Sequence, residues 1–217
     1  RVHALLKQNI IILKAISITS EIGHRRFLAS CASDYALHSQ VALLLEMLVF
    51  QEKKSSEIEA EIKRLAKPYR KQIEILTSFP GISVLTACAL IADIGDISRF
   101  ASAKKLASYL RSAPGVDSSN EVTKIKKTSK LGRRLSIGLL IQGVTHFKTA
   151  HPGLARWHES MMDRKKSKGK VRIGIVRKVI CQVYQMLTKG EYHHHRNSDL
   201  HSEKMREYDR LLASIAA

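Results

Sequence analysis

The sequence is poor in the features that mark secreted or membrane-spanning proteins. Its three cysteines, Cys31, Cys88 and Cys181, lie far apart in apolar surroundings, and no C-x-x-C pair occurs. An odd number of scattered cysteines argues against a disulfide framework and favours buried thiols in a reducing cytosol. The apolar run Val41–Phe50 is interrupted by Glu46 and falls short of the roughly 20 residues that a membrane span needs. The sequence therefore predicts a cytoplasmic protein without a membrane segment.

Acidic residues are scarce in the middle of the chain. The sequence has 37 lysines and arginines against 19 aspartates and glutamates, a formal net charge of +18. Residues 99–180 hold 20 of the basic and four of the acidic side chains, whereas the flanking segments are close to balanced. Solvated surfaces mix charges of both signs, so a segment of one sign indicates a polyanionic partner. Nucleic acid fits best; an anionic membrane surface and an acidic protein are the alternatives.

Helical periodicity dominates the N-terminal third. We expect helices at Arg1–Ile16 and Asp34–Arg70, joined by a loop near Ile22–Arg26. The second helix has an amphipathic stripe with spacings of three and four, formed by Leu37, Val41, Leu44, Leu45, Leu48, Ile58, Ile62 and Leu65. Its later half, Glu52–Lys71, is rich in Glu and Lys, as in coiled-coil helices. This pattern predicts a helical hairpin or coiled coil that packs against a second copy, giving a homodimer or higher oligomer; a long surface helix is the alternative.

A turn with a possible phosphate-binding role follows. Pro80 and Gly81 break the preceding helix, and Val84–Ile94 again has helical periodicity. The string resembles the helix-hairpin-helix motif, whose glycine-containing turn leaves helix N–H groups free for a phosphate oxygen. Gly81 and Ser83 are therefore candidate phosphate contacts, although Ser83 stands where the motif has its second glycine. A plain helix–turn–helix packing unit is the alternative.

The remaining chain also predicts helices, so the fold class is mostly α. Turn-forming composition makes Pro114–Lys130 a loop, with at most a small hairpin around Glu121–Lys127. Further helices are expected at Ser102–Leu110 with Ser102 as N-cap, at Leu131–Phe147, at Leu154–Asp163, at Arg172–Lys189 after a basic loop Arg164–Lys170, and at Ser202–Ala216. Three regions are expected: a helical hairpin or coiled coil at 1–75, a compact helical domain at 76–190 and a polar helical tail at 191–217.

The order of several motifs resembles one family. They are Phe79-Pro-Gly-Ile-Ser, Ile91-Ala-Asp-Ile-Gly-Asp, Pro114-Gly-Val-Asp-Ser-Ser, Thr128-Ser-Lys-Leu-Gly-Arg-Arg-Leu and Val176-Arg-Lys-Val. Together they resemble the C-terminal domain of insertion-sequence transposases of the one-ten/eleven-eleven group, which includes pilin-gene invertases and bridge-RNA-guided recombinases. The resemblance covers roughly residues 76–190 and implies DNA as partner, with a guide RNA as a further one.

The resemblance implies a serine nucleophile. In that family a loop serine five residues after a proline attacks DNA, which here is Ser119; Asn120 replaces the usual glycine, so adjacent Ser118 is the alternate. A serine hydroxyl can attack a phosphodiester and hold the strand as an ester, with cations around the phosphate oxygens. The candidate nucleic-acid-binding cations are Lys124, Lys126, Lys127, Lys130, Arg133, Arg134, Lys165, Lys166, Lys168, Lys170 and Arg172. Without the resemblance, both serines would be ordinary turn residues.

The chain has no evident carboxylate cluster for metal chemistry. The resemblance implies an upstream ribonuclease-H-like domain whose four acidic residues bind Mg²⁺, so we expect no cofactor on this part and no DNA cleavage by it alone. Asp93 and Asp96 share a helical face and could together hold a metal ion. Ending the helix beside Gly95 is their more ordinary role. The run His193-His194-His195, with His201, is expected to be a solvated tail or to bind nickel adventitiously, without a built metal site, because adjacent side chains diverge on a regular element.

Three functional hypotheses remain. The first is the DNA-binding and serine-bearing portion of a transposase or recombinase. The second is a non-catalytic helix-hairpin-helix module that binds nucleic acid. The third is a helical oligomerisation protein whose basic face keeps it in solution.

Overall fold

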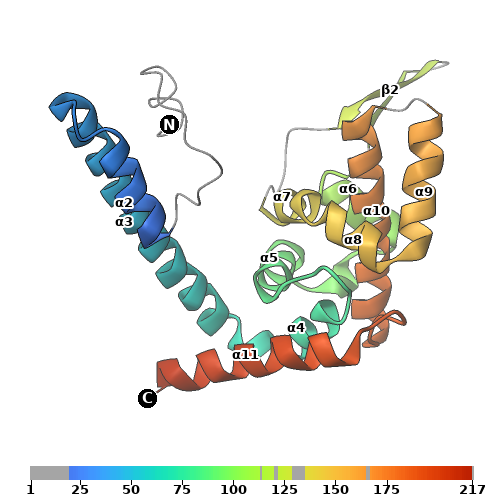
Figure 1. The fold of residues 1–217 in the computed structure, drawn as a ribbon. Helices are drawn as coiled ribbons and strands as arrows, with labels where there is room; N and C mark the ends of the chain where they lie inside the picture. The colour runs from blue at the N-terminus through green and yellow to red at the C-terminus, as the bar shows by residue number, and fades with distance from the viewer. Residues whose placement is uncertain (1–19, 113, 120–121, 129–134, 165–166, 217) are drawn as a thin grey trace. The chain divides into compact units, whose positions relative to one another are not determined.

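The computed structural model describes residues 20–112, 114–119, 122–128, 135–164 and 167–216 and is mostly α-helical, as expected (Figure 1). The chain divides into two compact units, Arg1–Glu61 and Ile62–Ala217. The second unit thus begins earlier and ends later than the 76–190 region expected from the sequence. The helix expected at Arg1–Ile16 lies outside the described residues. Within them, no helix is long and apolar enough to cross a membrane.

The first unit contains two packed helices. Helix α2 (Glu21–Ser30) occupies the place where a loop was expected, and that expectation is wrong. Ser20 caps the helix, since its hydroxyl accepts a hydrogen bond from the Gly23 amide at 3.0 Å, and Glu21 suits the positive end of the helix dipole. Phe27 and Cys31 pack against α3 (Tyr35–Leu65) through the buried residues Leu37, Val41 and Leu45.

Helix α3 is shorter than expected. Asp34 caps it by accepting a hydrogen bond from the Leu37 amide at 3.0 Å. The helix ends at Leu65, three residues before Pro68, which lacks an amide hydrogen and disfavours helix in the residue before it. A 3₁₀ turn η1 (Lys67–Tyr69) follows, and the chain continues as α4 (Arg70–Thr77).

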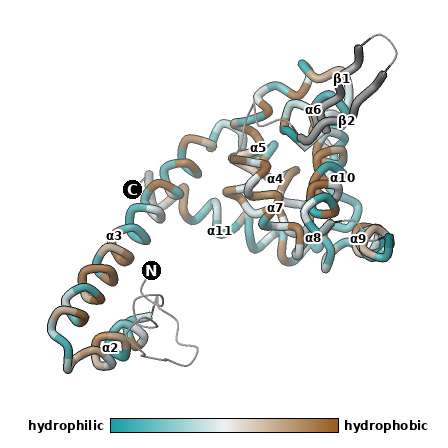
Figure 2. Tube along the Cα trace, turned by 90° about the horizontal axis from the view of Figure 1, so that it is seen from above, coloured by the Kyte–Doolittle hydropathy of each residue, from teal (hydrophilic) through white to brown (hydrophobic). Residues whose placement is uncertain are grey.

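The second unit is built around α10 (Lys168–Lys189). This helix packs against α4, α6 (Ala103–Tyr109), α7 (Leu135–Gln142), α8 (Val144–Ala150) and α9 (Pro152–Asp163), while α5 (Val84–Ile94) packs on α4 and α7. Figure 2 shows hydrophobic residues concentrated along α5 and along α10. Helix α5 has the bounds that its periodicity predicts, and Ser102 caps α6 as expected by accepting from the Lys105 amide.

Two segments of the second unit differ from their predicted secondary structure. Residues Pro114–Ser119 (β1) and Val122–Thr128 (β2) form an antiparallel hairpin where a loop with a smaller hairpin was expected. Interstrand pairing there overrides the turn preference of Gly, Asp and Ser. The single helix expected at Leu131–Phe147 is instead α7 and α8, which meet at Gly143.

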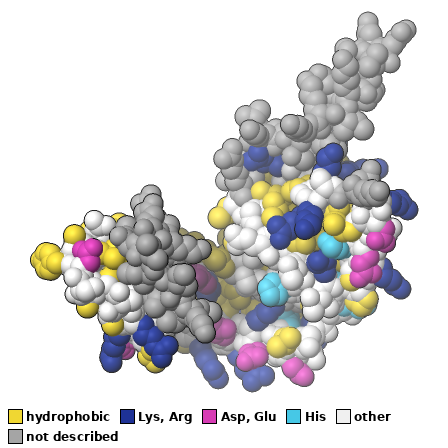
Figure 3. Space-filling view, turned by 45° about the horizontal axis from the view of Figure 1, so that its top comes forward, with side chains coloured by type: hydrophobic (Ala, Val, Ile, Leu, Met, Phe, Trp, Pro, Cys, Tyr) yellow, Lys and Arg dark blue, Asp and Glu magenta, His cyan; other side chains and the backbone are white. Residues whose placement is uncertain are grey.

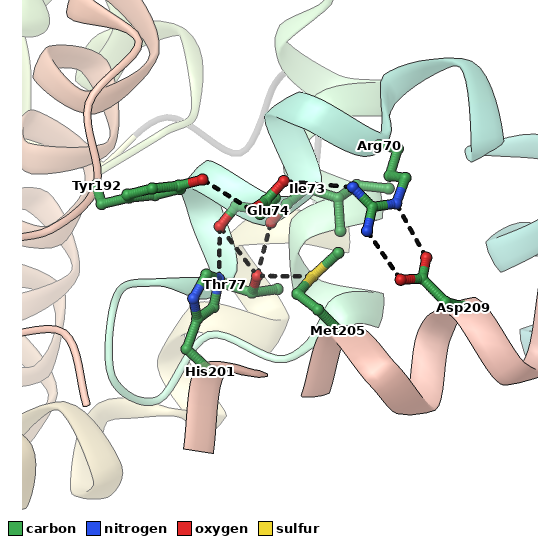
Figure 4. Close-up of polar contacts among 8 residues, drawn as sticks. All are labelled: Arg70, Ile73, Glu74, Thr77, Tyr192, His201, Met205 and Asp209. Carbon is green, nitrogen blue, oxygen red and sulfur yellow. Dashed lines mark hydrogen bonds and ion pairs between the residues drawn. The ribbon is translucent and has the colours of Figure 1, made fainter. Parts of the chain in front are cut away.

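The C-terminal segment is part of the second unit. Helix α11 (Ser198–Ala216) buries Met205 and Tyr208 in the core shared with α4 and α10. The guanidinium of Arg70 donates two hydrogen bonds to Asp209, at 2.9 and 2.8 Å, and a ring nitrogen of His201 lies 2.9 Å from the Glu74 carbonyl oxygen (Figure 4). These contacts join residues more than 120 positions apart, so the polar composition of the tail did not reveal them.

Candidate nucleic-acid interface

The β-hairpin carries the predicted nucleophile. Ser118 and Ser119 are the last two residues of β1, and their Cα partners on β2 are Thr123 and Val122. The predicted serine therefore lies at the end of a strand, beside the two-residue connection 120–121, which is outside the described residues. A serine at the tip of a hairpin is held by backbone pairing on one side only.

The predicted cations fall into three groups. Lys124, Lys126 and Lys127 belong to β2, opposite the serine-bearing strand. Lys168, Lys170 and Arg172 lie in the first turns of α10, which begins four residues earlier than predicted. The others, Lys130, Arg133, Arg134, Lys165 and Lys166, lie outside the described residues. Figure 1 shows the hairpin and the N-terminal end of α10 at the same end of the second unit.

The N-terminal end of α10 is strongly basic. Lys168, Lys170 and Arg172 are exposed and form no ion pair with any described residue. Ser167 makes no side-chain capping bond, and the first turn has no acidic residue. Cations at the positive end of a helix dipole repel it, so this end is suited to an anion that binds both the amide groups and the cations. Figure 3 shows lysine and arginine side chains over this face of the second unit.

The turn between α4 and α5 has a structural explanation for its glycine. Gly81 has a φ of +97°, and a Cβ there would lie 2.7 Å from a ring carbon of Phe147. The backbone conformation and the contact with Phe147 each exclude a side chain, so the fold itself explains the glycine. The hydroxyl of Ser83 accepts a hydrogen bond from the Thr86 amide at 3.1 Å, so one of the free helix amides already has a partner. The phosphate role of Gly81 and Ser83 stays a prediction.

A lysine from α11 forms a hydrogen bond with the backbone of the same turn. The ammonium of Lys204 donates to the Ile82 carbonyl oxygen at 3.1 Å, and burial lowers the pKa of this side chain. The turn borders an open groove of about 490 Å³, whose lining includes His146, His201 and Lys204. The exposed Ser83 lines the same groove.

The two aspartates at the end of α5 cap different helices. An Asp93 carboxylate oxygen accepts two hydrogen bonds from Ser136, from its hydroxyl at 2.6 Å and its amide at 3.1 Å, and so caps α7. Asp96 accepts from the amide and hydroxyl of Ser98, and these bonds lower the pKa of its carboxyl group. Gly95, with a φ of +62°, ends α5 between them, so Asp96 is not on the helix. The described residues therefore do not form the acidic cluster that Mg²⁺ needs.

The histidine segment is not a solvated tail. His193 is buried, and its amide donates to the Ser78 hydroxyl at 2.9 Å. Burial lowers the pKa of His193 to about 4, with the neighbouring histidines adding to the shift. His194 and His195 are exposed and lie beside buried His151 at the junction of α8 and α9. Sequence reasoning missed His151 because it is more than 40 residues away; its only local signal is the helix-breaking His-Pro-Gly string.

A second groove lies next to these histidines. It has a volume of about 690 Å³, and its lining includes His151, Trp157, Arg177 and Lys178. Trp157 packs partly against the core, and its ring would lie 2.3 Å from a Cβ at Gly174. The Lys178 ammonium stands 5.1 Å from the centre of the Trp157 ring. An aromatic face with two cations beside it is chemistry that also suits nucleic-acid binding.

Comparison with known proteins agrees with the motifs. Residues 73–158 match the model of the Transposase IS116/IS110/IS902 family. The chain is 27% identical over 139 residues to the insertion element IS110 uncharacterized 43.6 kDa protein of Streptomyces coelicolor, covering 64% of this chain and 34% of the relative. It is 26% identical over 137 residues to the transposase for insertion sequence element IS1111A of Coxiella burnetii (61% and 37%).

A third relative has a name that indicates DNA rearrangement. The chain is 32% identical over 120 residues to the pilin gene-inverting protein of Moraxella bovis, covering 54% of this chain and 37% of the relative. The chain thus spans about a third of the length of these curated relatives. Taken together, the comparisons show that part of this chain is similar to part of proteins named as transposases and pilin gene-inverting proteins.

Proposed function

We propose that the chain is the DNA-binding and serine-bearing portion of a transposase or site-specific recombinase that cuts and rejoins DNA. The observation that carries the proposal is the match of residues 73–158 to a transposase family, since this segment includes the hairpin with Ser118 and Ser119. The basic end of α10 supports it independently, because cations that form no ion pair within the described part of the chain, at a helix N-terminus, favour a phosphate backbone.

In this proposal the Ser119 hydroxyl attacks the phosphorus of a DNA phosphodiester. The Ser119 Oγ–P bond forms and the bond from phosphorus to the leaving nucleotide oxygen breaks. The proton of the serine hydroxyl passes to the leaving oxygen, which becomes a free hydroxyl group. The strand remains attached as a phosphoserine ester until a hydroxyl of another strand reverses the step and releases Ser119. Lysines and arginines near the hairpin and the start of α10 stabilise the charge on the phosphate oxygens.

The proposal assigns the Mg²⁺ chemistry to a ribonuclease-H-like domain that is not among the described residues. Asp93 and Asp96 do not replace it, because each is engaged in capping a helix. We therefore expect this chain by itself to bind DNA without cutting it. A guide RNA, which the resemblance implies, would be a second polyphosphate partner. A cytoplasmic location, as expected from the sequence, belongs to the same proposal.

Binding to duplex DNA at several salt concentrations tests the first half of the proposal. A protein that contacts six to ten phosphates loses roughly 10³- to 10⁵-fold in affinity between 50 and 200 mM salt. We expect the affinity of the chain for duplex DNA to fall by a factor in this range between the same salt concentrations. Affinity that does not change with ionic strength would contradict a phosphate-binding surface.

Alanine substitution of the two serines tests the second half. In a full-length protein that carries the metal domain, Ser119→Ala should abolish strand exchange and leave DNA affinity unchanged, whereas Ser118→Ala should be mild. Mass spectrometry of a trapped protein–DNA adduct would identify the reacting hydroxyl. An adduct on Ser118 would shift the assignment by one residue. Full activity of the double alanine variant would instead favour the non-catalytic nucleic-acid-binding module.

A further inference from the structure

His151 is a buried side chain with unsatisfied hydrogen-bonding groups. It is 9% exposed, and neither of its ring nitrogens has a hydrogen-bond partner among the described residues. Buried polar atoms are nearly always paired, and leaving one unpaired is costly. Its ring is also held in place, since it stacks against Phe79 with the ring centres 6.5 Å apart. The position therefore calls for a partner that bonds to an imidazole nitrogen.

Two further imidazoles face His151 from the loop before α11. The ring centre of His195 lies 4.8 Å from that of His151, and the ring centre of His194 lies 5.9 Å from it. One ring nitrogen from each of the three histidines lies within 4.8 Å of the others. His194 and His195 occupy an irregular turn, and this is why adjacent side chains converge here.

The turn is held in this conformation by its own contacts. The buried His193 ring accepts a hydrogen bond from the His195 amide at 3.2 Å and lies 3.2 Å from the Gln182 side-chain oxygen through its other nitrogen. The His193 ring also packs on Phe79, with centres 4.4 Å apart. The loop is thus anchored to α10 and to the α4–α5 turn before any ligand binds. A preorganised arrangement of this kind lowers the cost of bringing three side chains together.

We propose that His151, His194 and His195 bind one divalent transition-metal ion of the class that prefers imidazole, with Zn²⁺ as the representative. Three neutral imidazoles with an open fourth position for water form a common zinc site. Tetrahedral coordination separates the ligand nitrogens by about 3.3 Å for metal–nitrogen bonds of 2.0–2.1 Å. The present separations allow this after small side-chain rotations. The ion would give His151 the partner that it lacks.

The site would connect distant segments of the second unit. His151 lies between α8 and α9, whereas His194 and His195 lie between α10 and α11. A bound ion would therefore tie the C-terminal segment to the α8–α9 corner, next to the groove that contains Trp157. This inference does not depend on the proposed DNA chemistry and would hold if that proposal failed.

Metal titration of the unmodified chain tests the proposal. The chain, purified without an added histidine tag and stripped with EDTA, is titrated with Zn²⁺ by calorimetry and with Co²⁺ by absorption. We expect one ion per chain, a tetrahedral Co²⁺ spectrum and a higher melting temperature with Zn²⁺. Replacing His194 or His195 with Gln should each lower the affinity at least about tenfold. His158→Gln, on α9 outside the cluster, is the matched control and should bind as the unmodified chain does.

Substitution of the buried His151 distinguishes a preformed three-histidine site from adventitious metal binding by the two exposed histidines. His151→Gln should lose affinity to the same extent as the exposed variants while keeping its helical circular dichroism spectrum. If it binds Zn²⁺ as tightly as the unmodified chain, the exposed pair binds metal by itself and the proposal is wrong. If His151→Gln does not fold, the exposed variants decide: unchanged affinity in both, or no melting shift with Zn²⁺, would overturn the proposal.

Discussion

Replacing Asp93 should destabilise the second unit strongly. Asp93 is 6% exposed and Ser136 is fully buried, so water cannot replace the two hydrogen bonds between them. In Asp93→Ala the Ser136 hydroxyl and amide lose their acceptor, and each unsatisfied group costs about 1–3 kcal/mol. Because the two groups share one acceptor and the site can relax, we expect a total loss of about 2–4 kcal/mol. This is a large part of the 5–15 kcal/mol that stabilises a typical domain.

Two variants make the comparison specific. Asp93→Asn keeps an oxygen that can accept both bonds and should lose only about 1 kcal/mol. Asp96→Ala removes an exposed cap, where water can satisfy Ser98, and should lose much less stability than Asp93→Ala. Urea unfolding followed by circular dichroism measures all three, with a change of midpoint at constant slope reporting stability.

The result also decides whether these carboxylates are metal ligands. If they cap helices, Mg²⁺ should not change the melting temperature of the unmodified chain. A loss below about 1 kcal/mol in Asp93→Ala, equal to that of Asp96→Ala, would refute the capping argument. Stabilisation by Mg²⁺ that both substitutions abolish would show instead that the pair binds metal.

Three further predictions concern charge, assembly and pH. Charge reversal at Lys126, Lys127 and Arg133 should weaken DNA binding more than reversal at Lys53, Lys54 and Lys63, as measured by fluorescence anisotropy; equal losses would mean that only net charge matters. Helix α3 is expected to associate with a second copy. Leu44→Glu with Leu48→Glu, in the stripe, should therefore dissociate the oligomer or unfold it, whereas Leu43→Glu with Phe50→Glu, on the exposed face outside the stripe, should dissociate it with the helix content kept. Light scattering that shows a strict monomer of the unmodified chain at high micromolar concentration would rule out this association. Burial raises the pKa of Tyr208 from 10 to about 12, so its stabilising contribution is complete below pH 10 and is lost as the pH rises through 12. Tyr208→Phe should remove this part of the alkaline loss in unfolding experiments, and an unchanged pH profile would contradict the shift.

Local signals in the sequence were sufficient for several elements. Helix α5 is flanked by Ser83, which caps its start, and by Gly95, whose positive φ ends it, so its bounds follow from adjacent residues. Ser102 defines the start of α6 in the same way. The length of the hairpin was underestimated. Gly, Asp and Ser favour turns locally, whereas strand pairing depends on the partner strand. The loop expected near Ile22–Arg26 was wrong because capping by Ser20 outweighs a single glycine within the helix.

The sequence by itself determined the fold class, the one-sign charge of residues 99–180 and a set of motifs, most of which lie in the segment 73–158 that matches a transposase family. These properties depend on composition and on spacings of a few residues. Only the tertiary structure decided that Asp93 caps a helix 43 residues away, that Arg70 pairs with Asp209 across 139 residues, and that His151 meets His194 and His195. Such contacts arise from how helices pack, and helical periodicity shows which face of a helix is buried without showing which residue it meets.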